Sequence, residues 1–148
     1  MATINVHATC VALRLGRTWR GVLLRGPSGA GKSDLALRLV DEGGRLVADD
    51  RTDLAAKGRR LVASAPATIA GLLEVRGLGI VSLPRSRLAA RVEVALLVDL
   101  VAPRRIDRMP QPMSEKVMGI ALPVLALAPF EASAAAKLRL ALARSVPA

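Results

Sequence analysis

Aromatic residues and cysteine are almost absent from this chain of 148 residues. Trp19 and Phe130 are the only members of the Phe, Trp and Tyr group, and Cys10 is the only cysteine. A single cysteine excludes an intramolecular disulfide and suits a reducing compartment. Because aromatic side chains are so scarce, a bound purine has little to stack on. The aromatic surfaces that accompany positive charge in many nucleic-acid-binding proteins are missing too.

Long apolar segments are also missing. The N-terminus has no apolar run of the signal-peptide type, and the longest apolar stretch, 117–130, is too short to span a bilayer and contains prolines. We therefore expect a soluble, cytoplasmic protein that does not enter a membrane.

The remaining composition is that of a globular protein. Hydrophobic residues make up 52% and charged residues 23% of the sequence, and a chain of this length can bury a sizeable core. The formal net charge is +10, and 18 of the 22 basic residues are scattered arginines. We interpret the charge as an Arg-rich background together with phosphate handling, and we do not expect nucleic-acid binding.

The pattern of apolar residues predicts an α/β fold. Strands are expected at 4–15, 21–26, 45–50, 59–64, 72–83, 87–100 and 119–129, and helices at 32–44 and 131–144. The first third therefore follows a strand–loop–helix–strand order that is typical of nucleotide binding. No internal repeat or linker interrupts the sequence, so residues 1–148 are expected to form a single domain with a mixed β-sheet core and a C-terminal helix.

The stretch "GPSGAGKS" matches the phosphate-loop pattern G-x-x-x-x-G-K-[ST]. Its glycines allow backbone N–H groups to converge on an anion, and the helix that follows adds its positive N-terminal end. Lys32 supplies a cation for the β- and γ-phosphates, and the Ser33 hydroxyl suits Mg²⁺. We predict that ATP and Mg²⁺ bind here. The predicted nucleotide-binding residues are Gly26, Pro27, Ser28, Gly29, Ala30, Gly31, Lys32 and Ser33.

Carboxylates at strand ends are the candidates for phosphoryl-transfer chemistry. Asp49 and Asp50 end the stretch "RLVADD", and side chains of adjacent residues on an extended chain point to opposite sides. One acid could face the phosphates while the other serves the metal, although "DDRTD" is also typical of a solvated turn. Asp99 ends a second apolar strand. Glu74 and Arg76 share one face of the strand in "LLEVRGLGI", where they could bind metal and phosphate or form a surface ion pair.

Together, "GPSGAGKSDLALRLVDEGGRLVADDR" and "LLEVRGLGI" resemble the HPr kinase/phosphorylase family, the bifunctional serine kinases of the phosphotransferase-system carrier HPr. The resemblance extends from about residue 7 to residue 83. It implies a P-loop kinase domain of the phosphoenolpyruvate carboxykinase-like type. The chain resembles the short alphaproteobacterial form, which consists of the catalytic domain alone.

The resemblance also implies residue roles. Lys32 matches the catalytic lysine, Asp50 the residue that accepts the seryl proton, and His7 the catalytic histidine. Ser33 and Glu74 match the Mg²⁺ ligands, and we assign Asp49 to the metal as well. The implied partners are an HPr-like phosphocarrier and further copies of the chain, since the family forms hexamers.

The late part of the sequence departs from the family. The family's Pro-Gly-Arg-Asn segment has no match, and the chain reads "APFEASAAAKLRLAL" there. Kinase activity is therefore the safer expectation, and reverse phosphorolysis is open. A replacement cation could come from Arg85, Arg87, Arg104, Arg105 or Arg108. The alternatives are a small-molecule P-loop kinase or NTPase and a non-catalytic nucleotide-binding regulatory module.

Overall fold

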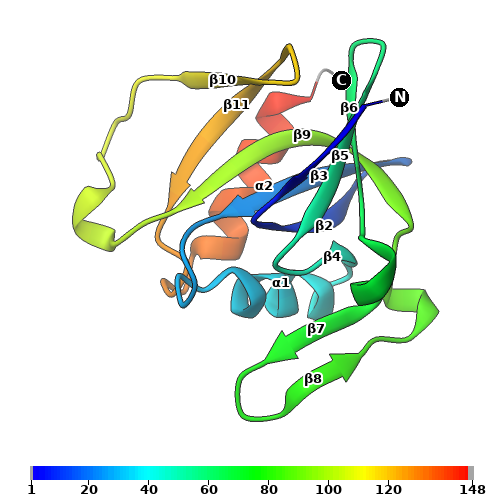
Figure 1. The fold of residues 1–148 in the computed structure, drawn as a ribbon. Helices are drawn as coiled ribbons and strands as arrows, with labels where there is room; N and C mark the ends of the chain where they lie inside the picture. The colour runs from blue at the N-terminus through cyan, green and yellow to red at the C-terminus, as the bar shows by residue number, and fades with distance from the viewer. Residues whose placement is uncertain (1, 147–148) are drawn as a thin grey trace.

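The computed structural model describes residues 2–146. Its main feature is a curled, nine-stranded sheet, and the last element of the chain is a helix (Figure 1). The strands are β1 (Thr3–Val6), β2 (Ala8–Leu15), β3 (Thr18–Arg25), β4 (Arg45–Ala48), β5 (Thr52–Lys57), β6 (Arg60–Ser64), β9 (Arg91–Leu100), β10 (Met113–Val117) and β11 (Ile120–Leu127). A separate ribbon is formed by β7 (Leu72–Val75) and β8 (Gly79–Ser82). The helices are α1 (Lys32–Asp41) and α2 (Ala134–Ser145), with short 3₁₀ turns η1 (Ala67–Ile69), η2 (Arg85–Arg87) and η3 (Pro103–Arg105). The expected mixed sheet and C-terminal helix are confirmed.

The long strand β9 joins the two parts of the sheet. The strand order is β1-β5-β6-β9-β3-β2-β4, and β3 and β11 both run parallel to β9. The first residues of β9 pair with β6, at Arg91–Glu93, whereas its last residues pair with β11, at 97–100. Because β6 and β11 contact different halves of one strand, the sheet can curl at β9.

Alternating side chains build a core on each face of the sheet. Val22 and Leu24 of β3 join the cluster that α1 and α2 cover, whereas Leu23 between them joins the cluster inside the curl. Both clusters consist almost entirely of Ala, Val and Leu, as the composition predicts. The helical face also buries Leu73 of β7, which ties the ribbon to the sheet beside α1.

Some elements differ from the sequence-based expectation. The predicted strand at 4–15 is broken at His7 into β1, which pairs with β5, and β2, which pairs with β3 and β4. The predicted strand at 72–83 is a hairpin, because Gly77 and Gly79 adopt positive φ angles between its halves. The strands β5 and β10 were not expected; β10 is mostly exposed and is held by its pairing with β11.

The carboxyl ends of the parallel strands lie at one edge of the sheet. There β3 leads into the phosphate loop, β9 into the segment that contains η3, and β11 into Pro129 and Phe130 (Figure 1). This edge is where open α/β sheets bind ligands. The start of β2 lies at the same edge, because Ala8 pairs with Arg25 at the end of β3. No helix within residues 2–146 is long and apolar enough to cross a membrane.

Candidate active site

The phosphate loop connects the buried end of β3 to the first turn of α1. Gly29 and Gly31 have φ angles of 83° and 102°, values that L-residues with side chains rarely adopt. The tip of the Phe130 ring and Pro129 also pack against Gly31, so that a Cβ there would lie 2.8 Å from the ring and would have to displace it. The Lys32 side chain is 6% exposed, and its ammonium donates hydrogen bonds to the carbonyl oxygens of Gly26 and Pro27. The loop is thus a tight arch with a cation held against it.

Asp49 joins the phosphate loop to two other parts of the site. It lies just after β4 and is only 7% exposed. Its Oδ1 accepts hydrogen bonds from Ser33 Oγ at 2.7 Å and from Thr9 Oγ1 at 2.9 Å. Its Oδ2 accepts one from the Glu74 backbone N–H at 3.0 Å. One carboxylate therefore fixes the loop serine, the start of β2 and the ribbon strand β7 relative to one another.

Asp50 occupies a strained turn next to Asp49, which we call the hub of the site because it binds Ser33, Thr9 and Glu74. Its φ angle is 67°, and the N–H of Arg51 donates to the carbonyl of Asp49 at 2.7 Å, which closes a three-residue turn around Asp50. Strained backbone of this kind concentrates at functional sites. The two acids do diverge, as expected, but because of this turn, since β4 ends at Ala48 and the pair is not extended strand.

His7 contacts the outward-facing member of the pair. Its Nε2 lies 2.8 Å from Asp50 Oδ1, and the His7 and Asp50 side chains are 37% and 63% exposed. Because an ionised carboxylate only accepts hydrogen bonds, His7 Nε2–H is the donor. The break between β1 and β2 places this histidine beside Asp50. His7, Asp50, Asp49 and Ser33 thus form one continuous hydrogen-bonded group through Thr9, whose Oγ1 also accepts from the Asp50 N–H.

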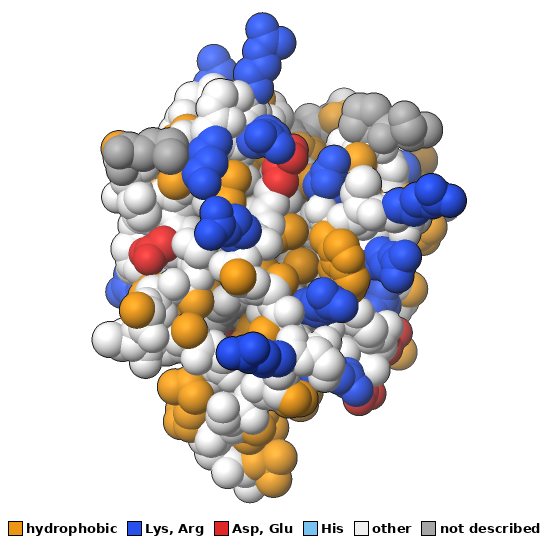
Figure 2. All heavy atoms as spheres, turned by 90° about the vertical axis from the view of Figure 1, so that its right-hand side faces the viewer, with side chains coloured by type: hydrophobic (Ala, Val, Ile, Leu, Met, Phe, Trp, Pro, Cys, Tyr) orange, Lys and Arg blue, Asp and Glu red, His pale blue; other side chains and the backbone are white. Residues whose placement is uncertain are grey.

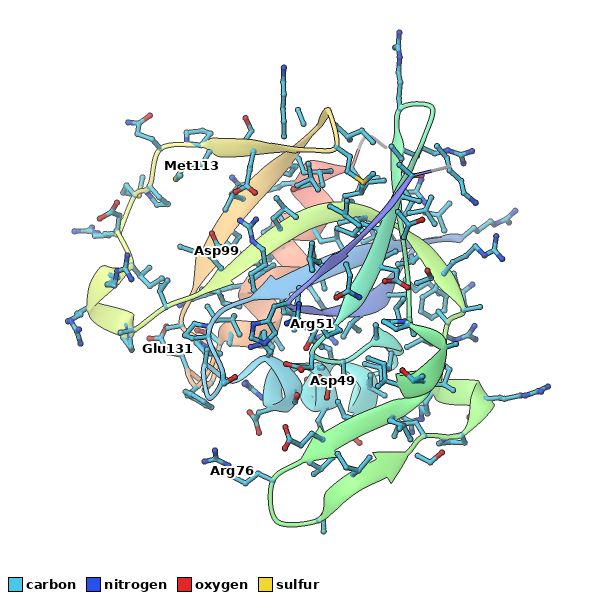
Figure 3. The ribbon with its side chains drawn as sticks, in the orientation of Figure 1. Asp49, Arg51, Arg76, Asp99, Met113 and Glu131 are labelled. Atoms are coloured by element: carbon cyan, nitrogen blue, oxygen red, sulfur yellow. The ribbon has the colours of Figure 1, made fainter. Side chains whose placement is uncertain are left out.

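The structure brings Glu74, but not Arg76, to this group. Glu74 reaches Asp49 through its backbone, and its exposed carboxylate makes no hydrogen bond or ion pair to any residue within 2–146. Arg76 lies beyond the end of β7, in the turn of the ribbon, so the two residues do not share a strand face (Figure 3). The alternative of a Glu74–Arg76 surface ion pair is not found either.

Asp99 is held by Arg25, the last residue of β3. The Arg25 guanidinium binds Asp99 through Nε, at 2.7 Å, and Nη2, and it binds both Oε atoms of Glu115 on β10 through Nη1 and Nη2. The hydrogen bonds that Arg25 donates to Glu115, with those that it donates to Asp99, raise the pKa of Arg25, although partial burial opposes this. The same Arg25 contact lowers the pKa of Glu115. Asp99 therefore braces the strand that carries the phosphate loop.

The arginines that could replace the family's missing cation fall into two groups. Arg85 and Arg87 lie on η2, where Arg85 is exposed and Arg87 donates to the backbone carbonyl of Val40 near the C-terminal end of α1. Arg104, Arg105 and Arg108 are exposed in or beside η3, on the side of the molecule that carries the phosphate loop, and they form no ion pair with any residue that the structure describes (Figure 1). The arginines beside η3 are therefore the candidate cations on the side of the phosphate loop. Within residues 2–146, no group of three or more His, Cys, Asp or Glu side chains is arranged to hold a metal ion.

Three residues of the site escaped sequence reasoning. Thr9 is fully buried and links both aspartates. The sequence feature that could have revealed it is a hydroxyl residue within the apolar strand that follows His7. Arg25 ends an apolar strand at the foot of the phosphate loop, where a charge is unusual. Phe130 is 69% exposed although it packs on Gly31. Its exposed ring is an aromatic surface next to the phosphate loop.

Comparisons with known proteins place this geometry in a family. Residues 2–138 match the family model described as the HPr serine kinase C-terminal domain. An HPr kinase/phosphorylase from Lactobacillus acidophilus is 43% identical over 102 residues, which is 66% of this chain and 30% of the relative. One from Clostridium tetani is 50% identical over 64 residues, which is 43% of this chain and 21% of the relative. This chain thus matches less than a third of the length of either relative.

A solved structure extends the likeness to the fold. The Hpr(Ser) kinase/phosphatase from Coxiella burnetii superposes with a TM-score of 0.78 and 28% sequence identity, and the match covers 95% of this chain and 88% of that one. The family resemblance seen in the phosphate loop and "LLEVRGLGI" is therefore confirmed well beyond residue 83. The chain belongs to the family of the HPr serine kinase C-terminal domain.

Proposed function

We propose that this chain is an ATP-dependent protein kinase that phosphorylates a serine of HPr or of an HPr-like phosphocarrier. The observation that carries the proposal is the hydrogen-bonded group at the end of β4. Asp49 is tied to the phosphate-loop Ser33, and the adjacent Asp50 faces solvent beside His7. A phosphoryl donor and an incoming hydroxyl need these two environments side by side.

We further propose that the fold is of the P-loop, phosphoenolpyruvate carboxykinase-like type, with residues 1–148 acting as one catalytic domain. The arch of residues 26–33 would hold the triphosphate of ATP, with Lys32 exchanging its loop carbonyls for phosphate oxygens. The oxygen donors of Ser33, Asp49 and Glu74 are the hard ligands that suit Mg²⁺. Bound there, Mg²⁺ would offset the negative charge of the phosphates.

The proton is handled by the exposed acid. Asp50 accepts the proton of the seryl hydroxyl as that oxygen attacks the γ-phosphorus and the bond to the ADP oxygen breaks. The His7 hydrogen bond at 2.8 Å leaves the second carboxylate oxygen of Asp50 open to the hydroxyl. Asp49, which we assign to Mg²⁺ and whose oxygens already accept three hydrogen bonds from the protein, does not take this proton.

Partner recognition rests on charge and on access to the site. A net charge of +10 favours association with an acidic carrier in the cytoplasm. We assign the stabilisation of transferred charge to the cations beside η3, Arg104, Arg105 and Arg108, which replace the family's late arginine.

Homo-oligomerisation, with a hexamer as the expected form, is testable by light scattering on the purified chain.

The deciding assay incubates the chain with ATP, Mg²⁺ and purified HPr-like carriers and maps phosphoserine by mass spectrometry. The same reaction is run backwards with phosphoserine-carrier and inorganic phosphate to test phosphorolysis. Labelling of one serine that disappears with a Ser→Ala carrier supports the proposal. ATP hydrolysis without carrier labelling would instead favour a small-molecule kinase or NTPase, and ATP binding without turnover a regulatory module.

A further inference from the structure

A hollow of about 320 Å³ lies at the end of α1 that points away from the phosphate loop. It is lined by Arg14, Trp19, Asp41, Arg45, Ser86 and Arg87, together with the backbone of Gly43 and Gly44. Figure 2 looks onto the side of the molecule that carries η2, where basic side chains are spread around exposed apolar surface. The volume is at the lower end of the range for small-molecule sites.

Three arginines from three different elements reach this hollow, and each is oriented by an uncharged group. Arg14 Nε on β2 donates to the Gly16 carbonyl at 2.9 Å. Arg87 Nη1 on η2 donates to the Val40 carbonyl at 2.7 Å. The Arg45 guanidinium on β4 stacks over the Trp19 ring, 4.5 Å from its centroid. These contacts hold the guanidinium groups in place but leave most of their five N–H donors unused.

The charges of these arginines are not matched by carboxylates. Elsewhere in the chain, Arg25, Arg38 and Arg139 each form an ion pair with an acid. Within residues 2–146, the arginines of the hollow form none. One acid, Asp41, and the negative C-terminal end of α1 offset part of the charge. The balance stays positive, so the hollow favours an anion that carries more than one charge.

We propose that this hollow binds a small multivalent anion, a phosphorylated or polycarboxylate metabolite, at a site separate from the phosphate loop. Planar guanidinium groups suit phosphate and carboxylate oxygens through paired hydrogen bonds. The part of the Trp19 ring that borders the hollow supplies apolar surface for the carbon skeleton of the ligand. This inference does not depend on the proposed kinase activity.

Trp19 makes the site directly observable, because it is the only tryptophan and the chain has no tyrosine. The full chain and its Lys32→Ala variant are titrated with pyrophosphate and, separately, with citrate at constant ionic strength. A saturable change in Trp19 fluorescence, equal in both proteins, is expected because the phosphate loop is not involved. Saturation by pyrophosphate alone assigns the site to phosphate compounds, and saturation by citrate alone assigns it to carboxylates.

Matched charge removals test the location. Arg14→Ala is expected to weaken anion binding about tenfold, since it removes charged hydrogen bonds. Arg59→Ala removes the same charge from the exposed turn between β5 and β6, outside the hollow, and is expected to change affinity less than about twofold. Circular dichroism checks that both variants are folded. No saturable response to either anion, or equal weakening by both variants, overturns the proposal.

Discussion

Replacing Asp49 by alanine should destabilise the fold by about 3 kcal/mol, because three donors lose their acceptor at once. Thr9 Oγ1 is fully buried, and the Glu74 N–H lies in the part-buried start of the ribbon. Leaving each of these two groups unpaired costs about 1–3 kcal/mol. The Ser33 hydroxyl is partly exposed and can turn to water, so it adds little.

The conservative variant separates hydrogen bonding from packing. In Asp49→Asn, the amide can turn so that its oxygen accepts from the Glu74 N–H while its two N–H groups donate to the hydroxyl oxygens of Thr9 and Ser33. We therefore expect a loss of only about 1 kcal/mol. Asp50→Asn, one residue along, should change stability by less than about 0.5 kcal/mol, because Asp50 is exposed and asparagine tolerates its backbone angles.

Urea unfolding followed by circular dichroism measures all three variants on one scale. The Asp49→Ala value corresponds to a fall in Tm of roughly 6–12 °C for a chain of this size. The order Asp49→Ala, then Asp49→Asn, then Asp50→Asn is the expected result. If Asp49→Ala and Asp50→Asn unfolded at the same urea concentration, the role of Asp49 as the hub of the site would be refuted.

Three further predictions concern other parts of the chain. Phe130→Ala should weaken ATP binding roughly fivefold in calorimetry through loss of about 1 kcal/mol of base stacking, while pyrophosphate binding stays unchanged; equal weakening of both would contradict a role toward the base. Burial raises the pKa of the Cys10 thiol to about 12, so a thiol reagent should label it only on unfolding, and rapid labelling of the native protein would argue against the core described above. Glu115→Gln should cost about 0.5 kcal/mol at neutral pH. Because the contact with Arg25 lowers the pKa of Glu115, this difference should be present above the usual glutamate pKa of about 4.3 and vanish as pH falls through the lowered value; a difference that persisted in acid would contradict the ion pair.

The loop before α1 and the position of two adjacent acids after β4 could be predicted because their signals are local. The spacing of Gly26, Gly31 and Lys32 determines a loop before a helix, and "RLVADD" places two acids at a strand end wherever that strand pairs. Such features need no knowledge of which strands are neighbours. The apolar runs in the sequences of β3 and β9 likewise predict buried strands, which the structure contains.

Other parts of the site depend on pairing between distant segments. Thr9 meets Asp49 only because β2 lies beside β4, and Phe130 meets Gly31 only because β11 joins β9. The turn that "DDRTD" allows is present around Asp50, but its positive φ angle could not be read from the sequence, since the surrounding hydrogen bonds impose it. The strand β5, with the sequence "TDLAAK", has weak β propensity and forms because β1 and β6 flank it.

The most direct test of the central claim is the single-turnover rate of γ-phosphoryl transfer from ATP to the carrier serine in wild type and Asp50→Asn. Binding of ATP to both proteins is measured in parallel. If Asp50 accepts the seryl proton, the variant should transfer about 10²–10⁴ times more slowly with ATP affinity nearly unchanged. A variant that transferred phosphate at close to the wild-type rate would contradict the division of work between the buried Asp49 and the exposed Asp50.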